Sequence, residues 1–252
     1  MSRNILLTIQ YDGSGFSGWQ IQPGSRTVQG DIQSCLGRIC GAPVKINGTS
    51  RTDAGVHALG QRATFSLETG IPVERLKPVM NSMLPGDIKI TEAVEMPEDF
   101  HARFNSKGKK YIYRIMNLAE KDVFKRNFYY YVDRELDIEK MREAASRIVG
   151  THDFECFMAM GSTPQKTTVR TIYSYEIETA ERENGAKEIE LAVSGDGFLY
   201  NMVRIMTGTL VEVGLGKKKP EDIDRMIETG KRSLAGHTAP PQGLYLAEVF
   251  YE

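Results

Sequence analysis

The sequence has little of what marks secreted or metal-binding proteins. Its 252 residues contain three cysteines, four histidines and one tryptophan. An odd, sparse set of cysteines without a CxxC pair argues against a disulfide framework and indicates a reducing compartment, so we expect a cytoplasmic protein. The histidines are scattered and lack HExxH spacing, so we expect no metal.

Long apolar runs and a surplus of one charge are also missing. No stretch approaches the roughly 18 apolar residues of a membrane span, and the apolar run after Asn4 is too short for a signal peptide, so we expect no membrane association. With 40% hydrophobic and 26% charged residues, the chain is globular rather than disordered. Its 32 basic and 33 acidic residues give a net charge of −1, which taken alone argues against a nucleic-acid partner.

The charge is nevertheless distributed unevenly. Residues 101–126 contain eight basic and two acidic side chains, a local charge of +6, and the rest of the chain carries −7. Aromatic residues, including Tyr111, lie between the basic ones. This interleaving suits phosphate contact combined with base stacking. The alternative is a solvated strand edge whose lysines prevent aggregation.

Hydrophobic periodicity predicts interleaved strands and helices. Alternation predicts strands at residues 5–9, 43–46, 61–67, 87–94, 109–116, 167–178, 187–194 and 244–250. Helical spacing predicts helices after Thr27, at 72–83, after Asp137 as far as Gly150, at 198–213 and after Pro220. Because many strands look antiparallel, the pattern favours an α+β fold over a parallel doubly wound sheet.

Residues 13–18 match the GxGxxG pattern of dinucleotide-binding loops. That site requires a helix that opens directly on the third glycine. Here Trp19 and a further turn-rich segment follow, so we expect a flexible hairpin loop rather than a nucleotide site.

The glycine-flanked loop at residues 48–57 combines Arg51 and Asp53 with hydroxyl side chains. Polar groups on a loop held by a scaffold are often catalytic. A carboxylate near an arginine stays ionised, which suits a nucleophile. A capped turn with a surface ion pair explains the composition equally well.

Arg204 lies among apolar residues of a predicted helix. Its charge is costly there unless it is paired, which implies an acid partner, and Asp53 is a candidate. The alternative is that Arg204 extends along the helix to reach solvent.

Together these segments resemble the bacterial-type tRNA pseudouridine synthases that act on the anticodon stem-loop. The matching segments follow the family's order over nearly the whole chain: 11–13, 18–20, 51–57, 84–88, 100–104, Tyr111 with Tyr113, 201–204 and 243–246. Two departures are Ser50, where many members have glycine, and Asn105 after the segment 100–104.

The resemblance implies two like-built halves, residues 1–104 and 105–252, each a mostly antiparallel sheet with helices on one side and an active-site cleft between them. It also implies a homodimer whose partner is tRNA, isomerisation of uridine at tRNA positions 38, 39 and 40, and a reaction that needs no cofactor or metal.

The resemblance further assigns roles to five residues. Asp53 is similar to the family's nucleophile and Arg204 to the arginine that pairs with it. Tyr111 resembles the tyrosine that stacks on the target base, Arg51 the arginine that helps hold the flipped-out conformation, and Leu244 an apolar wall of the pocket. Whether the aspartate attacks the sugar C1′ or the base stays open.

Two other functions are compatible with parts of the sequence. A non-catalytic RNA-binding protein on the same scaffold would bind RNA without modifying it. An enzyme with a nucleotide cofactor would use the glycine-rich segment 13–18.

Overall fold

The computed structural model describes residues 2–161, 167–182 and 185–252. The chain forms two compact units, Met1–Lys107 with Tyr245–Glu252, and Gly108–Leu244. The division therefore falls three residues beyond the expected one after residue 104, and the last strand from Tyr245 onward belongs with the first unit rather than the second.

The first unit is built on a mostly antiparallel sheet with the strand order β4-β1-β3-β10. Its strands are β1 (Arg3–Tyr11), β2 (Asn47–Gly48), β3 (His57–Leu67), β4 (Ile88–Met96) and β10 (Leu244–Phe250). β2 pairs with β3 antiparallel, whereas β10 pairs with β3 in parallel and sets Tyr245 opposite His57. Alternate residues of β1 are fully buried, as the sequence pattern predicts.

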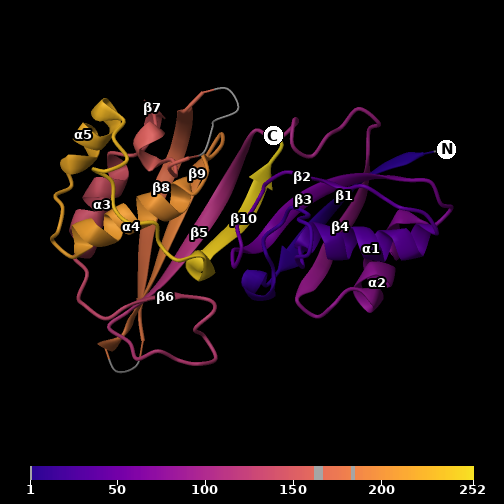
Figure 1. Cartoon of the computed structure of the whole chain (residues 1–252), viewed down its shortest axis with the longest axis horizontal. Coiled ribbons are helices and arrows are strands. Elements are labelled where there is room, and N and C mark those ends of the chain that lie inside the picture. The colour runs from indigo at the N-terminus through magenta and orange to yellow at the C-terminus, as the bar shows by residue number, and fades with distance from the viewer. Residues whose placement is uncertain (1, 162–166, 183–184) are drawn as a thin grey trace. The chain divides into compact units, whose positions relative to one another are not determined.

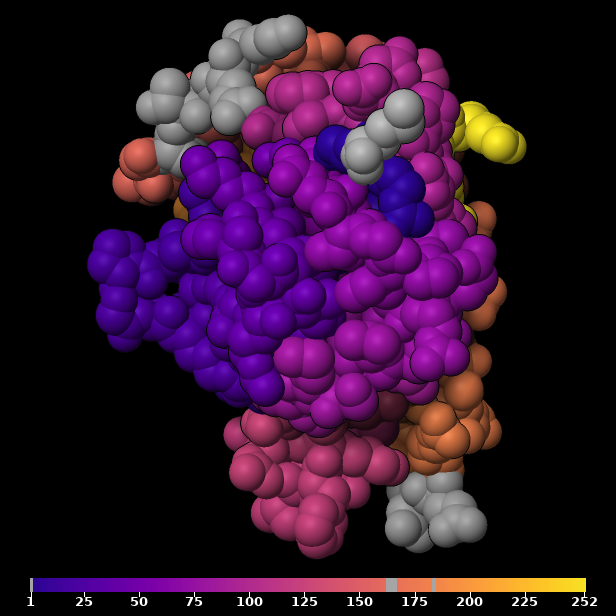
Figure 2. All heavy atoms as spheres, turned by 90° about the vertical axis from the view of Figure 1, so that its right-hand side faces the viewer, coloured from indigo at the N-terminus to yellow at the C-terminus, as the bar shows by residue number. Residues whose placement is uncertain are grey.

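Two helices complete the first unit, α1 (Val28–Cys40) and α2 (Val73–Met83). Thr27 caps α1 by accepting from the backbone N–H of Gly30, and Gly41 ends it in the left-handed conformation at φ 69°. α2 packs on β4. Figure 2 looks onto this unit, whose residues up to Lys107 run from indigo to magenta.

The second unit has an antiparallel sheet with the order β5-β9-β8-β7. Its strands are β5 (Gly108–Asn117), β6 (Tyr130–Val132), β7 (Gly150–Asp153), β8 (Val169–Glu181) and β9 (Lys187–Gly195). β6 adds to β5 in parallel. The β5–β9 register sets Tyr111 opposite Val193.

The helices of the second unit are α3 (Ile138–Ser146), α4 (Met202–Gly214) and α5 (Asp222–Thr229). α3 packs on both α4 and β8, and Figure 1 shows the three helices grouped together beside the sheet. α4 is buried along nearly its whole length. The α+β class and the mostly antiparallel sheets are therefore as predicted.

Three predicted elements differ from the structure. The strand predicted at 43–46 is wrong, because those residues form no ladder and pairing begins only at β2. The helix predicted from 198 starts at Met202, because Asn201 before it is left-handed at φ 59°. The helix after Asp137 ends at Ser146 rather than at Gly150, which instead begins β7.

Within the described residues, no helix is both long and apolar enough to cross a membrane.

Candidate functional site

Residues 49–56, here called the aspartate loop, join β2 to β3 in the first unit. Asp53 is half-buried and Arg51 is exposed, so the two charged groups of the loop have different environments. Thr52 is buried, and its hydroxyl lies 2.7 Å from the hydroxyl of Tyr11. The loop therefore presents Asp53 from a base that is tied to the sheet.

The neighbouring segment 13–19 holds the backbone of the aspartate loop. The N–H of Trp19 donates to the carbonyl of Thr52 at 3.0 Å, and the N–H of Gly55 donates to the carbonyl of Phe16 at 3.4 Å. Within the loop, the N–H of Val56 donates to the carbonyl of Asp53 at 3.1 Å. Asp53 thus lies between two residues whose backbones are fixed from outside the loop.

Glycine is needed where the two segments touch. A Cβ on Gly13 would overlap the carbonyl of Val56, and a Cβ on Gly18 would lie 2.6 Å from the carbonyl oxygen of Thr52. Gly18 also has φ +92°, a conformation that side-chain-bearing residues rarely adopt. Two glycines of the GxGxxG pattern, Gly13 and Gly18, therefore support the aspartate loop.

The expectation of a flexible hairpin at residues 13–18 is wrong, because the segment leads from β1 to α1 and packs against the loop. Trp19 is only 3% exposed. The structural requirement for a dinucleotide site is not met, since α1 begins at Val28 rather than at the third glycine.

Gln61 fixes the start of the aspartate loop. It is fully buried, and its amide nitrogen donates to the carbonyl of Ser50 at 2.7 Å while its amide oxygen accepts from the N–H of Ser50 at 3.2 Å. Sequence reasoning missed this residue. The available signal was a glutamine inside a strand that is otherwise apolar on its buried face.

His57 fixes the end of the loop. It is 1% exposed, its ring stacks on Tyr245 with centroids 4.7 Å apart, and its Nδ1 accepts from the N–H of Gly13 at 3.1 Å. Its Nδ1 also lies 3.2 Å from Oδ1 of Asp12, and the same oxygen accepts from the backbone N–H of Ser14.

The second unit carries Tyr111 and Tyr113 on one face of β5. Tyr111 is 8% exposed and meets Phe198 edge-on, with centroids 5.1 Å apart. Tyr113 is fully buried and donates its hydroxyl to the carbonyl of Pro240 at 2.6 Å. Burial raises the pKa of Tyr113 well above its ordinary value and the charge of Arg204 offsets this only in part, so the phenol is a neutral donor.

Arg204 lies in the first turn of α4, and polar atoms hold its guanidinium. Its Nε donates to the carbonyl of Ala239 at 2.7 Å, and one terminal nitrogen donates to Asn201 Oδ1 at 2.8 Å. The side chain is half-buried. The two acceptors explain how the charge is accommodated near an apolar helix, and the pairing with Asp53 stays a prediction.

Leu244 is the first residue of β10 and is 6% exposed. Gly243 before it packs against Tyr113, and a Cβ on Gly243 would lie 2.7 Å from that ring. The position of Leu244 is therefore set by the contact between the preceding turn and β5.

The structure distributes the predicted site residues over the two units. Asp53 and Arg51 share the aspartate loop, whereas Tyr111, Arg204 and Leu244 belong to the second unit. No group of three or more potential metal-ligating His, Cys, Asp or Glu side chains occurs in the part of the chain that the structure describes.

Comparison with known proteins identifies relatives over almost the full length. A family model described as tRNA pseudouridine synthase matches residues 7–105 and 144–252. The chain is 48% identical over 249 residues to the tRNA pseudouridine synthase A of Acetivibrio thermocellus. The alignment covers 99% of this chain and 100% of the relative. It is 45% identical over 249 residues to the enzyme of the same name from Caldicellulosiruptor bescii, with the same coverage.

Among solved structures, the archaeal box H/ACA sRNP Nop10-Cbf5 complex aligns with 82% of this chain and 44% of the matched chain, with a TM-score of 0.34 and 14% identity. A similarity of this size carries no argument about function.

Proposed function

Because this chain belongs to the tRNA pseudouridine synthase family, whose members are isomerases that convert uridine to pseudouridine in RNA, we propose that it modifies uridines 38, 39 and 40 of the tRNA anticodon stem-loop. In this proposal Asp53 is the nucleophile.

The observation that carries the proposal is the support of the aspartate loop. Backbone hydrogen bonds to Thr52 and Gly55 bracket Asp53 and hold it half-buried. A carboxylate carried by a fixed backbone loses less conformational freedom in the reaction, which favours nucleophilic catalysis. A simple capped turn would not need two segments fitted together through glycine.

The reaction conserves all atoms. The C1′–N1 bond breaks, the uracil turns, and a C1′–C5 bond forms while C5 loses a proton and N1 gains one. The carboxylate of Asp53 reacts either at C1′ or at the base, and in both routes it is regenerated at the end. No oxidant, reductant or net hydrolysis is needed.

The other site residues act on the base and on the nucleophile. A uridine inside a stem-loop must leave the stack, at a cost of a few kcal/mol that stacking on Tyr111 offsets. Arg51 holds the flipped-out conformation, and Leu244 forms an apolar wall that retains the free uracil. The charge of Arg204 keeps Asp53 ionised.

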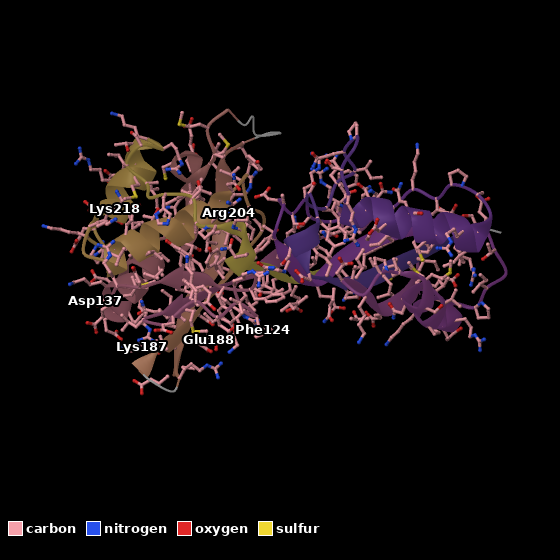
Figure 3. The ribbon with its side chains drawn as sticks, turned by 60° about the horizontal axis from the view of Figure 1, so that its bottom comes forward. Phe124, Asp137, Lys187, Glu188, Arg204 and Lys218 are labelled. Carbon is pink, nitrogen blue, oxygen red and sulfur yellow. The ribbon has the colours of Figure 1, made fainter. Side chains whose placement is uncertain are left out.

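The basic residues between 101 and 126 supply contacts to the RNA backbone. The turn after β5 exposes Lys121, Lys125 and Arg126 around Phe124, which is 86% exposed (Figure 3). Cations around an exposed aromatic ring suit phosphates and an unpaired base. We further propose that the enzyme works as a homodimer in the cytoplasm. Sedimentation of the purified protein tests whether it is a dimer.

The test is to incubate the enzyme with unmodified tRNA and map pseudouridine chemically. Asp53→Asn should lower the rate by about a thousandfold or more while tRNA binding persists, because the nucleophile is lost and the binding surface is kept. Asp99→Asn, an exposed acid of the same unit, is the control and should stay active.

Two results would overturn parts of the proposal. Product from Asp53→Asn at the wild-type rate would exclude Asp53 as the nucleophile. Pseudouridine at other tRNA positions, but none at 38, 39 or 40, would exclude the anticodon stem-loop as the target.

A further inference from the structure

Residues 236–243, here called the strap, lead into Leu244 along the buried helix α4. Two glycines allow the strap and the helix backbone to touch. A Cβ on Gly208 of α4 would overlap the carbonyl of His237, and a Cβ on Gly236 would lie 2.7 Å from Thr209 Cα. The N–H of Gly236 donates to the hydroxyl of the fully buried Thr209 at 2.8 Å.

Glu212, near the end of α4, holds the strap by its side chain. Its Oε1 accepts from both the backbone N–H and the Nδ1 of His237, each at 3.0 Å. Its Oε2 lies 3.5 Å from Nζ of Lys218, which in turn donates to the carbonyl of Leu234 at 2.9 Å. The carboxylate is thus the centre of a polar cluster that fixes the first residues of the strap.

This carboxylate is ionised in the folded protein. Burial by itself raises the pKa of Glu212, but the hydrogen bonds from His237 and the charge of Lys218 outweigh burial and hold the pKa below its ordinary value.

Ala239, in the middle of the strap, binds both the side chain and the main chain of Arg204. Nε of Arg204 donates to the carbonyl of Ala239 at 2.7 Å, and the N–H of Ala239 donates to the carbonyl of Arg204 at 3.0 Å. At the next residue, the carbonyl of Pro240 accepts the hydroxyl of Tyr113. The strap therefore determines where the guanidinium of Arg204 lies and where Leu244 begins β10.

We propose that Glu212 is a positioning residue for Arg204 and Leu244, and that it acts through the strap. Arg204 and Lys218, labelled in Figure 3, both lie beside the ribbon of α4 and the segments that follow it. Glu212 is eight residues after Arg204, about 12 Å along the helix, so it does not touch the guanidinium itself. The inference rests on the proposed roles of Arg204 and Leu244.

The main test is Glu212→Ala assayed on unmodified tRNA at a temperature well below the unfolding midpoint of every variant. We expect kcat to fall about tenfold or more with little change in KM, because displacing a catalytic group by about 1 Å costs up to about 100-fold in rate without altering the distant RNA contacts. Glu212→Gln should recover most of the rate, since its amide oxygen still accepts the N–H of His237.

Glu139→Ala, on the exposed side of α3 and paired with Arg142 in the same helix, is the matched control and should keep the wild-type kcat. Thr209→Val removes the hydroxyl that accepts from the N–H of Gly236 at nearly constant shape, and it should lower kcat in the same selective way. If Glu212→Ala does not fold, Thr209→Val tests whether the strap positions Arg204.

A double-variant cycle separates this inference from the proposed function. If Glu212 acts through Arg204, Arg204→Ala with Glu212→Ala should be scarcely slower than Arg204→Ala alone. An unchanged kcat in folded Glu212→Ala or Thr209→Val, or fully additive losses in the double variant, would overturn the inference. An active Arg204→Ala would instead overturn the role proposed for Arg204.

Discussion

The aspartate loop and the strap perform the same task by different means. In the first unit, backbone hydrogen bonds from a neighbouring segment fix the loop on either side of Asp53, glycines make the close fit possible, and the side chain of Gln61 holds only the start of the loop. In the second unit, the strap is also fitted to α4 through glycines, but side chains supply most of its hydrogen bonds, those of Glu212, Thr209 and Tyr113.

The difference determines how each part responds to mutation. A backbone support fails when atoms are added, because two main chains in contact cannot yield. A side-chain support fails when a donor or acceptor is removed, because the partner is left unsatisfied. We therefore expect the loop around Asp53 to be sensitive chiefly to added volume, and the strap to be sensitive to lost polar groups as well.

The largest effect is expected from Gly13→Ala. Its Cβ would overlap the carbonyl of Val56, so the free energy of unfolding should fall by about 3 kcal/mol and activity should be lost with it. Urea denaturation and the modification assay measure the two effects.

The control for Gly13→Ala is Gly24→Ala. Gly24 has φ +71° but nothing within 4 Å of an added Cβ, so only backbone strain of about 1 kcal/mol is expected and activity should persist. Equal losses in the two variants would contradict the steric explanation.

A smaller effect distinguishes two tyrosines that each donate to a backbone carbonyl. Tyr113 donates to Pro240 in the second unit, and Tyr251 donates to Ala102 at 3.0 Å in the first. Changing either to phenylalanine should lower the free energy of unfolding by about 1 kcal/mol, measured in urea.

Tyr113→Phe should also lower kcat, because its hydroxyl supports the strap. Tyr251→Phe should lower kcat less, because the hydroxyl of Tyr251 lies 3.2 Å from that of Thr49 at the start of the aspartate loop and takes no part in the backbone bonds that bracket Asp53. If Tyr251→Phe lowers kcat as much, side chains hold both regions and the comparison fails.

The smallest effect is a pH dependence that belongs to the second unit. The pKa of Glu212 is held below its ordinary value of 4.5, so its contribution to stability is present above that value and is lost as pH falls through the folded pKa. The loss should be below about 1 kcal/mol.

Hydrogen exchange at about pH 6 and about pH 3 can follow this loss. Amides of α4 and the strap should lose protection on acidification before those of β1, and Glu212→Gln should remove the pH-dependent part of the change. If the amides of β1 lost protection before those of α4 and the strap, the acid sensitivity would belong to the first unit.

Elements with local signals could be predicted from the sequence. α1 follows from the cap at Thr27 and the left-handed stop at Gly41, and β10 follows from alternation alone. The start of α4 could not be predicted, because the left-handed Asn201 occurs inside an apolar pattern that reads as continuous helix. β6 and β7 are too short to show a period.

The site was predictable only in part for a related reason. Asp53 could be predicted as a candidate because an acid near an arginine in a glycine-flanked loop suits a nucleophile, although a capped turn has the same composition. The support of its loop by Gly13 and Gly18 could not be predicted, because it is a steric fit to a backbone distant in sequence and no periodicity of the sequence signals it. Glu212 is a single acid on an apolar helix, and its partner His237 occurs in a turn-rich segment that predicts nothing by itself.

The pairing of β10 with β3 has a consequence for how the protein is made. The sheet of the first unit takes up a strand that is translated only after the entire second unit, and that strand sets Tyr245 on His57 at the base of the aspartate loop. During synthesis the aspartate loop therefore lacks its last support until this strand has been made. Such long-range closure is slow, so a ribosome-bound chain should already have an ordered second unit while the aspartate loop is not yet in place.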